Sequence, residues 1–519
     1  MKLPGDLVRM YREVHGWVGI ISGLALFIAF YAGALTMFEL PLQRWASAPV
    51  ALSPPPSLEQ TPALVERVLA AHPEAAKSYE ITLAPDAARP ARMSWTVRQP
   101  GDHAGEGEQF FASLGPDGSL EVVREGPSQV AQLIDILHQQ VGLPFAHEIS
   151  MPIMGAIALL YTVALVSGLV VLLPSLVSDL FALRIGRNVK RMWLDLHNVL
   201  GLFSLPFHII MALTALVFAF HDQFYDAQGL VLGGEDPEPV EQIAAGPPAA
   251  VLNPAEIVRR LQQQAPGFEP QVLAYRQAAG GSRSLSVQGS DQRYGMRGAT
   301  YGMAGVDPAT GTITETDYMP GMQDGWSATV TSFFALHFGN FGGDAVRWAY
   351  FLLGLAGAML FYTGNLLWVE SRRRRERTSG AVEQTRATRI LGALTVGVPL
   401  GCVSGISVTL AVARLLPGTS YGLHSAIYYA VFLALAGWAL LRGAARSGGE
   451  LPIVAAVATL CIPVASFAIG RSPVLLVDVT ATVLAIALLL ASRSARRRAV
   501  DGASDSVWSL SQGTDRRPA

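Results

Sequence analysis

The chain has 519 residues, of which 51% are hydrophobic and 15% charged, and its formal net charge is −2. This composition excludes a string of soluble domains and predicts a polytopic α-helical membrane protein; the near-zero net charge gives no reason to expect nucleic acid as a partner. The two cysteines, Cys402 and Cys461, form no CxxC or CxxCH motif, so any cofactor must be held by other residue types.

The first predicted helix follows the stretch "REVHGWVG" (12–19). The run "GWVGIISGLALFIAFYAGALTMF" is long enough to cross a hydrocarbon core of roughly 30 Å. The alternative is a cleaved signal peptide, because "ASA" at 46–48 resembles a cleavage site. The run is too long for a typical signal and its pattern recurs in mid-chain, so we interpret residues 1–38 as a retained transmembrane helix.

Seven further apolar runs follow, which makes about eight predicted spans in all. They lie at 147–173, 194–220, 344–369, 389–413, 423–441, 452–469 and 474–492. Arginine-rich and lysine-rich segments precede the first span and follow the second, fourth, sixth and eighth. The positive-inside rule therefore predicts that both termini are cytoplasmic, with a basic linker at 371–388 and a disordered tail at 493–519.

Two long segments, 39–137 and 221–336, fall on the opposite, periplasmic side. Each has a Pro-rich linker and then a helix-like stretch, "ALVERVLAAHP" or "PAEIVRRLQQQAP". The runs "QFFASLGPDGSLEVV" and "TYGMAGVDPATGTITET" are typical of hairpins, because Pro, Asp and Gly form their turns. We expect two small α+β modules, separated by spans two and three (138–220) and followed by span four (337–370).

The order of histidine, span and module occurs twice. His15 and His197 are 182 positions apart (197 − 15), and His138 and His337 are 199 apart (337 − 138). The topology places the first pair at the cytoplasmic face and the second at the periplasmic face. A single interfacial histidine is typically an amphipathic anchor, but four at equivalent positions indicate a functional site.

Imidazole is a common metal ligand and an axial ligand of haem iron. Zinc and copper sites gather three or four ligands, and no acidic or sulfur cluster accompanies these histidines. Haem needs fewer protein ligands, because two imidazoles complete the coordination of a six-coordinate haem iron. Gly19 and Gly201 lie one helical turn after His15 and His197, where they would leave room for a macrocycle; close helix packing explains them equally well. Candidate partners for the haem propionates are Arg12, Arg191 and Arg347.

His208 lies eleven residues after His197. On one straight helix both would share a face, so His208 could replace one outer ligand. A buried histidine bonded to a neighbouring helix is the alternative.

Four stretches resemble the PepSY-associated transmembrane family, over about residues 1–375: "VHGWVGIISGLALFIAFYAGAL", "LDLHNVLGLFSLPFHIIMALTAL", "LHFGNFGGDAVRWAYFLLGLAGAMLFYTGNLLW" and "VDPATGTITE". This family includes integral-membrane ferric-siderophore reductases of the bacterial inner membrane. The resemblance implies PepSY-like modules, and His15 with His197 and His138 with His337 as ligands of two b-type haems. The chain departs from the family at Thr214–Ala215, where a Gly often follows the Thr, and in the accessory four-helix region 389–492.

The leading hypothesis is thus a membrane electron-transfer protein that reduces a ferric siderophore. No nucleotide-binding motif is visible, so the donor is a separate cytoplasmic reductant or a quinol. A non-enzymatic PepSY-type sensor and an iron–siderophore transport component are the alternatives.

Overall fold

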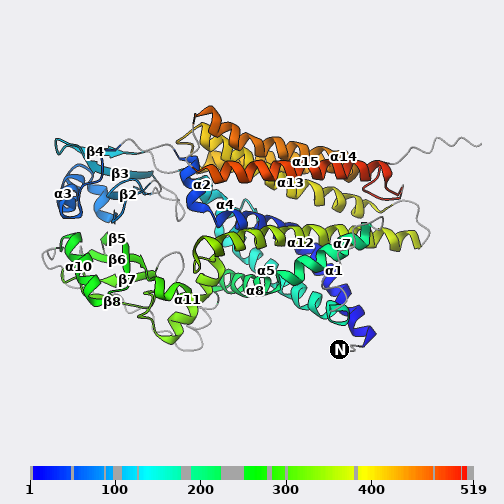
Figure 1. Cartoon of the computed structure of the whole chain (residues 1–519), viewed down its shortest axis with the longest axis horizontal. Helices are drawn as coiled ribbons and strands as arrows, with labels where there is room; N and C mark the ends of the chain where they lie inside the picture. The colour runs from blue at the N-terminus through cyan, green and yellow to red at the C-terminus, as the bar shows by residue number, and fades with distance from the viewer. Residues whose placement is uncertain are drawn as a thin grey trace, which may run out of the picture. The chain divides into compact units, whose positions relative to one another are not determined.

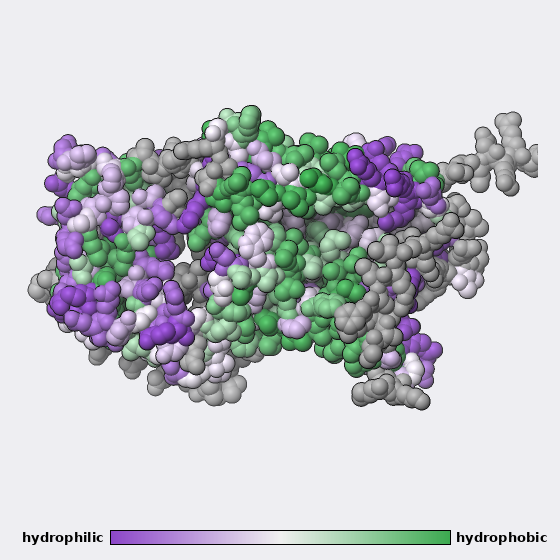
Figure 2. All heavy atoms as spheres, viewed as in Figure 1, coloured by the Kyte–Doolittle hydropathy of each residue, from purple (hydrophilic) through white to green (hydrophobic). Residues whose placement is uncertain are grey.

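A computed structural model describes residues 4–47, 52–86, 89–97, 108–124, 128–176, 189–221, 223, 251–277, 283–297, 302–378, 384–470, 474–503 and 505–510. The chain divides into two compact units. Unit 1 comprises 1–46, 129–220 and 348–519, and unit 2 comprises 47–128 and 221–347. In the view of Figure 2 apolar residues cover the middle of the helices of unit 1, whereas the surface of unit 2 is largely polar.

The helices of unit 1 include the predicted spans. They are α1 (Gly5–Thr36), α5 (His147–Leu172), α7 (Val189–Phe203), α8 (Leu205–Ala219), α12 (Gly343–Thr378, which begins in unit 2), α13 (Arg386–Leu415), α14 (Tyr421–Ala468) and α15 (Leu475–Asp501). Among the described residues six helices are long and apolar enough to cross a membrane, or up to seven if the bent pair α7–α8 is one span. The protein is thus a multi-pass membrane protein, and the predicted eight spans would further require α14 to cross twice.

Helix α14 is 48 residues long and is broken at Gly443, whose φ is 75° and ψ 162°. Before the break, α14 runs antiparallel to α13: Gly405 lies against Tyr428, and Gly397 against Ala436 and Ala439. After it, Ser407 Oγ lies 3.2 Å from Thr459 Oγ1 and Gly392 packs on Ala444, so this arm runs parallel to α13. The chain therefore reverses at Gly443, where the left-handed φ favours glycine, and the two arms pack with α13 and α15 (Figure 1).

The predicted third span is not one straight helix. Helices α7 and α8 meet at Ser204 with a bend of 69°. Pro206, in the first turn of α8, has no N–H to donate to the preceding turn, which is an ordinary cause of a kink. The prediction that His208 shares the face of His197 is therefore wrong, because it assumed a continuous helix.

The boundaries of the first module also need correction. Helices α2 (Glu39–Ala46) and α4 (Val130–Gln139) belong to unit 1, not to the periplasmic module predicted at 39–137. Leu133, Ile134 and Leu137 of α4 are at most 2% exposed and join the helical core. Trp45 of α2 is fully buried and its indole donates hydrogen bonds to Ser466 and Asp478. These apolar faces are stabilised by burial against other helices.

The C-terminal residues were predicted to be disordered from 493 onward. Helix α15 instead continues to Asp501, and residues 505–510 pack back on the helices. Arg373 of α12 pairs with Asp505 at 2.8 Å, and Val507 N–H donates to Gln384 Oε1 at 2.6 Å. The remainder of the tail, 511–519, and the segments 177–188 and 379–383, the second of which is part of the predicted basic linker, lie outside the described residues.

Unit 2 contains one antiparallel sheet of eight strands in the order β4-β3-β2-β1-β5-β6-β7-β8. The strands are β1 (Ser78–Thr82), β2 (Met93–Val97), β3 (Glu108–Leu114), β4 (Leu120–Val123), β5 (Glu269–Gln277), β6 (Arg283–Ser290), β7 (Gly302–Val306) and β8 (Ile313–Glu315). Both predicted hairpins form, as β3–β4 and β7–β8.

The two predicted modules are halves of one domain. Strands β1 and β5 pair with Tyr79 opposite Tyr275, and the two rings stack with centroids 4.9 Å apart. Helices α3 (Thr61–Ala71) and α10 (Pro254–Gln264) place Leu64 and Leu261 in the same buried core. Two separate modules would leave β1 and β5 as exposed edges, and pairing them satisfies both rows of backbone groups.

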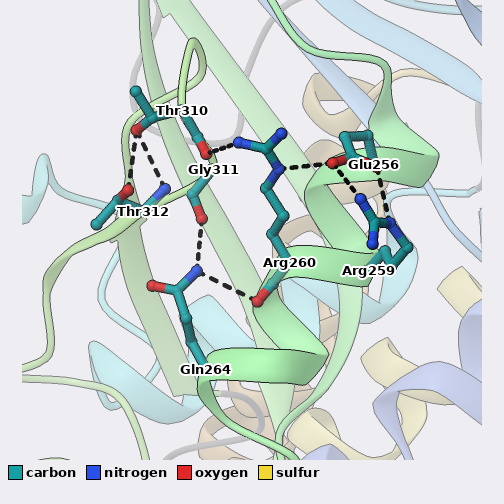
Figure 3. A network of polar contacts seen from close by, with 7 residues as sticks. All are labelled: Glu256, Arg259, Arg260, Gln264, Thr310, Gly311 and Thr312. Atoms are coloured by element: carbon teal, nitrogen blue, oxygen red, sulfur yellow. Dashed lines mark hydrogen bonds and ion pairs between the residues drawn. The ribbon is translucent and has the colours of Figure 1, made fainter.

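Helix α10 fixes the turn between β7 and β8 (Figure 3). Arg260 Nη1 donates to the Thr310 carbonyl at 2.7 Å and is oriented by Glu256. Gln264 Nε2 donates to the Gly311 carbonyl at 2.8 Å, and the Ile313 N–H donates to Gln264 Oε1 at 3.1 Å. The side-chain amide of Gln264 thus serves as the hydrogen-bond partner of two backbone groups of the turn, the Gly311 carbonyl and the Ile313 N–H.

Gln264→Ala is expected to loosen this turn. Loss of one net hydrogen bond of about 1 kcal/mol would speed amide exchange at Ile313 about fivefold. Hydrogen–deuterium exchange of the intact protein measures this, with the neighbouring exposed Gln263→Ala as the control. Equal exchange at 313 in both variants would contradict the assigned role.

Candidate functional site

Three of the predicted histidines lie in unit 1, and each makes the same kind of contact with a neighbouring helix. His15 Nδ1 lies 2.8 Å from the Ala164 carbonyl of α5, His138 Nδ1 2.8 Å from the Ala29 carbonyl of α1, and His197 Nδ1 3.1 Å from the Leu360 carbonyl of α12. A carbonyl only accepts, so Nδ1–H is the donor in each case. The proton is then on Nδ1, and Nε2 carries the lone pair that can bind a metal.

A glycine four residues beyond each carbonyl makes the contact possible. A Cβ at Gly168 would lie 2.9 Å from His15 Cε1, one at Gly33 2.7 Å from His138 Nδ1, and one at Gly364 3.4 Å from His197 Cε1. A side chain at the first two positions would collide with the imidazole, and at the third it would press on it. We call each carbonyl with its glycine a histidine cradle: Ala164 with Gly168, Ala29 with Gly33, and Leu360 with Gly364.

The cradle glycines were not among the predicted site residues. Each follows a small residue within its span, as Ala32–Gly33, Ser167–Gly168 and Thr363–Gly364. This recurrence was the available signal, but small residues are common wherever transmembrane helices pack.

His15 and His197 come together. Their ring centroids lie 6.1 Å apart with an interplanar angle of 71°. A metal–imidazole bond is roughly 2.0–2.1 Å and the ring centroid lies roughly 1.2 Å behind the nitrogen, so two imidazoles on opposite sides of one ion have centroids roughly 6.4–6.6 Å apart. Among the described residues neither Nε2 has a hydrogen-bond partner, since the bonds of both rings are made by Nδ1. The observed distance of 6.1 Å is slightly shorter than that of two imidazoles bound on opposite sides of one metal ion.

The predicted glycines differ in their surroundings. A Cβ at Gly19 would meet no atom within 4 Å, so open space lies beside this position, as a macrocycle requires. A Cβ at Gly201 would meet Leu360 Cδ1 at 3.4 Å, which is ordinary helix packing. Gly19 fits the predicted role, and Gly201 fits the packing alternative.

The outer pair is divided between the units. His138 lies in α4 of unit 1, whereas His337 lies near the end of α11 (Gly325–Phe338) in unit 2. Helix α11 ends at Gly339, whose φ of 59° is left-handed. The pairing of His138 with His337 stays a prediction.

His208 has a different environment. Its Nδ1 lies 2.6 Å from the Tyr161 hydroxyl, and its ring packs against Phe30, Phe207 and Phe361. The side chain is 0% exposed and Nε2 is enclosed without a partner among the described residues. No space for a macrocycle adjoins this nitrogen, so the packing favours His138 over His208 as an outer ligand.

The three arginines predicted to pair with haem propionates differ in their exposure and in their existing ion pairs. Arg12 is exposed near the start of α1. Arg191 pairs with the buried Asp195 at 3.0 Å, and Arg347 lies 3.6 Å from Asp344. Arg191 is thus held by a carboxylate, and Arg12 is the more accessible cation on the His15 helix.

One protein-family model matches most of the chain. No curated protein matches the chain. The model of the PepSY-associated TM region matches residues 12–371, which include all four predicted ligands and three histidine cradles. The match covers more than half of the 519 residues. The chain therefore belongs to the PepSY-associated transmembrane family.

Proposed function

We propose that this protein is a b-haem electron-transfer protein of the bacterial inner membrane that reduces a ferric siderophore on the periplasmic side. The observation that carries the proposal is the pair His15 and His197, whose ring centroids are 6.1 Å apart and whose Nδ1 atoms are both bound to helix carbonyls. Two histidines held in this way, with Nε2 left for a metal, are the arrangement that axial haem ligation needs.

His15 and His197 would hold one haem, and His138 and His337 a second. When bound, haem supplies a metal that accepts and releases single electrons. The carbonyls of Ala164, Ala29 and Leu360 orient three of the four imidazoles and make them more basic. Arg12 would pair with a propionate near the His15 end, and Arg347 is the corresponding candidate near His337.

The substrate follows from the family resemblance and from iron chemistry. Siderophores bind Fe(III) through hard oxygen ligands, and these hold Fe(II) less strongly, so reduction releases the metal. The positive-inside rule places both termini in the cytoplasm and unit 2 in the periplasm. The eight-stranded sheet of unit 2 would then face the incoming siderophore.

The absorption spectrum of the purified full-length protein tests this proposal. A dithionite-reducible b-type Soret band is expected. His15→Ala or His197→Ala should remove about half of the bound haem, because each leaves one iron with a single axial ligand. His147→Ala, at an exposed position at the start of α5, is the control. A colourless protein after expression with adequate haem would refute the proposal and favour the PepSY-type sensor.

The role of His208 has its own test. His208→Phe should leave the haem content unchanged, because Nε2 has no room for a macrocycle. Haem content by pyridine haemochromogen assay measures this. Loss of one haem from a folded His208→Phe protein would show instead that His208 is an axial ligand.

The cradles predict a second effect. Gly168→Ala places a methyl group 2.9 Å from His15 Cε1, so the ring must shift at a cost of about 1–3 kcal/mol. We expect one of two haems to lose its six-coordinate low-spin spectrum. Gly437→Ala, whose Cβ meets nothing within 4 Å, is the matched control. Identical spectra for the two variants would contradict the cradle.

A further inference from the structure

A cavity of about 60 Å³ lies between α12 and the bundle of α13, α14 and α15. Tyr362 and Leu366 of α12 form one wall, and Gly448 and Pro452 of α14 lie across from it. Arg498 of α15 and Trp508 also line it. The volume exceeds several-fold the roughly 10–15 Å³ that a single water needs, so the space can hold several waters or a small group of a ligand.

Three residues with hydrogen-bond donors line this otherwise apolar space. They are Tyr362, Arg498 and Trp508, which carry a hydroxyl, a guanidinium and an indole N–H. Within the described part of the chain none of these groups hydrogen bonds to protein; Arg498 instead lies over the Trp193 ring, 5.2 Å from its centroid. Polar groups in such places normally have partners, and a few convergent donors in an apolar cavity are typical of a small-molecule site. An oxygen acceptor, from water or from a ligand, would complete the hydrogen bonding of these groups.

The cavity lies on the far side of α12 from the His15–His197 pair. Leu360, Thr363 and Gly364 face His197, and the Thr363 hydroxyl is 3.2 Å from His197 Nδ1. Tyr362 and Leu366, one turn apart, face the cavity. One helix, roughly 10–12 Å across with its side chains, thus separates the cavity from the histidine pair.

We propose that this cavity binds the ring of a membrane quinol and is the point where electrons enter the protein. A quinol has a flat apolar ring with two oxygens, and its isoprenoid chain stays in lipid. Tyr362 and Arg498 would contact one ring oxygen. This inference rests on the proposed function, because it names the electron donor of that function.

The quinol loses one proton from each hydroxyl and two electrons from the ring, and leaves as the quinone. The protons pass to water at the nearer membrane face. The oxidant would be ferric haem of the proposed function, two equivalents of which would each accept one electron.

Variants at two glycines of α14 test the site. Gly448→Leu fills the cavity, since a Cβ there meets no atom within 4 Å and the residue lines its wall. Gly437→Leu is the matched control, because its Cβ also meets nothing within 4 Å but it does not line the cavity. Tyr362→Phe removes one donor, and Arg498→Gln replaces the charged guanidinium by a shorter neutral amide; neither change adds volume.

The probe is decylubiquinone, measured by equilibrium binding to the purified full-length protein. A photoreactive azidoquinone, mapped by mass spectrometry, locates the site. Gly448→Leu and Arg498→Gln should weaken binding at least tenfold, Gly437→Leu should bind as the natural chain does, and label should appear in 444–452 or 495–508. Reduction of the haem by decylubiquinol should slow by the same factor, with the dithionite-reduced amplitude unchanged.

The outcomes separate this inference from the proposed function. Unchanged decylubiquinone binding in both Gly448→Leu and Arg498→Gln would overturn the quinol site. Haem loss from Arg498→Gln with unchanged quinone binding would also overturn it and assign Arg498 to a haem propionate. A natural protein without any Soret band would refute the haem proposal, and quinone binding would still report on the cavity.

Discussion

The hydrogen bond from an imidazole Nδ1–H to a helix carbonyl is the interaction on which the candidate site depends. A helix carbonyl already accepts from the N–H one turn further on, and it has a second lone pair for another donor. A side chain on that later residue would cover the oxygen, and glycine removes it. The histidine thereby gains a fixed position and a fixed tautomer from the backbone of another helix, so His15, His138 and His197 each tie two helices together.

The two halves of the duplicated sequence can be compared at the positions of the histidine cradle. The cradle of His138, Ala29 and Gly33, lies 14 and 18 residues after His15 (29 − 15 and 33 − 15). The corresponding positions after His197 are Met211 and Ala215 (197 + 14 and 197 + 18). The departure from the family at Thr214–Ala215 thus falls where a cradle glycine would stand, so the two halves differ at a position equivalent to a ligand contact.

Outside the site, segments that are far apart in the sequence are held together because each supplies hydrogen-bond partners or apolar contacts that the other lacks. Strands β1 and β5 each have an edge, and pairing them merges two similar halves into one sheet with one core. In unit 1, Trp45 near the start of the chain finds its partners at Ser466 and Asp478, which docks α2 on the accessory helices. Arg373 and Asp505 connect α12 to the end of the chain in the same way.

The sequence by itself determined the multi-pass character, both hairpins and the pairing of His15 with His197, because these follow from local hydropathy, turn residues and repeat spacing. Tertiary structure decided the rest: the bend at Ser204 moved His208 off the face of His197, α4 joined the helices, and the modules merged. Gly33, Gly168 and Gly364 matter only through a side chain on another helix, which no local pattern names. Contacts between distant segments depend on three-dimensional packing, and periodicity along one element cannot supply them.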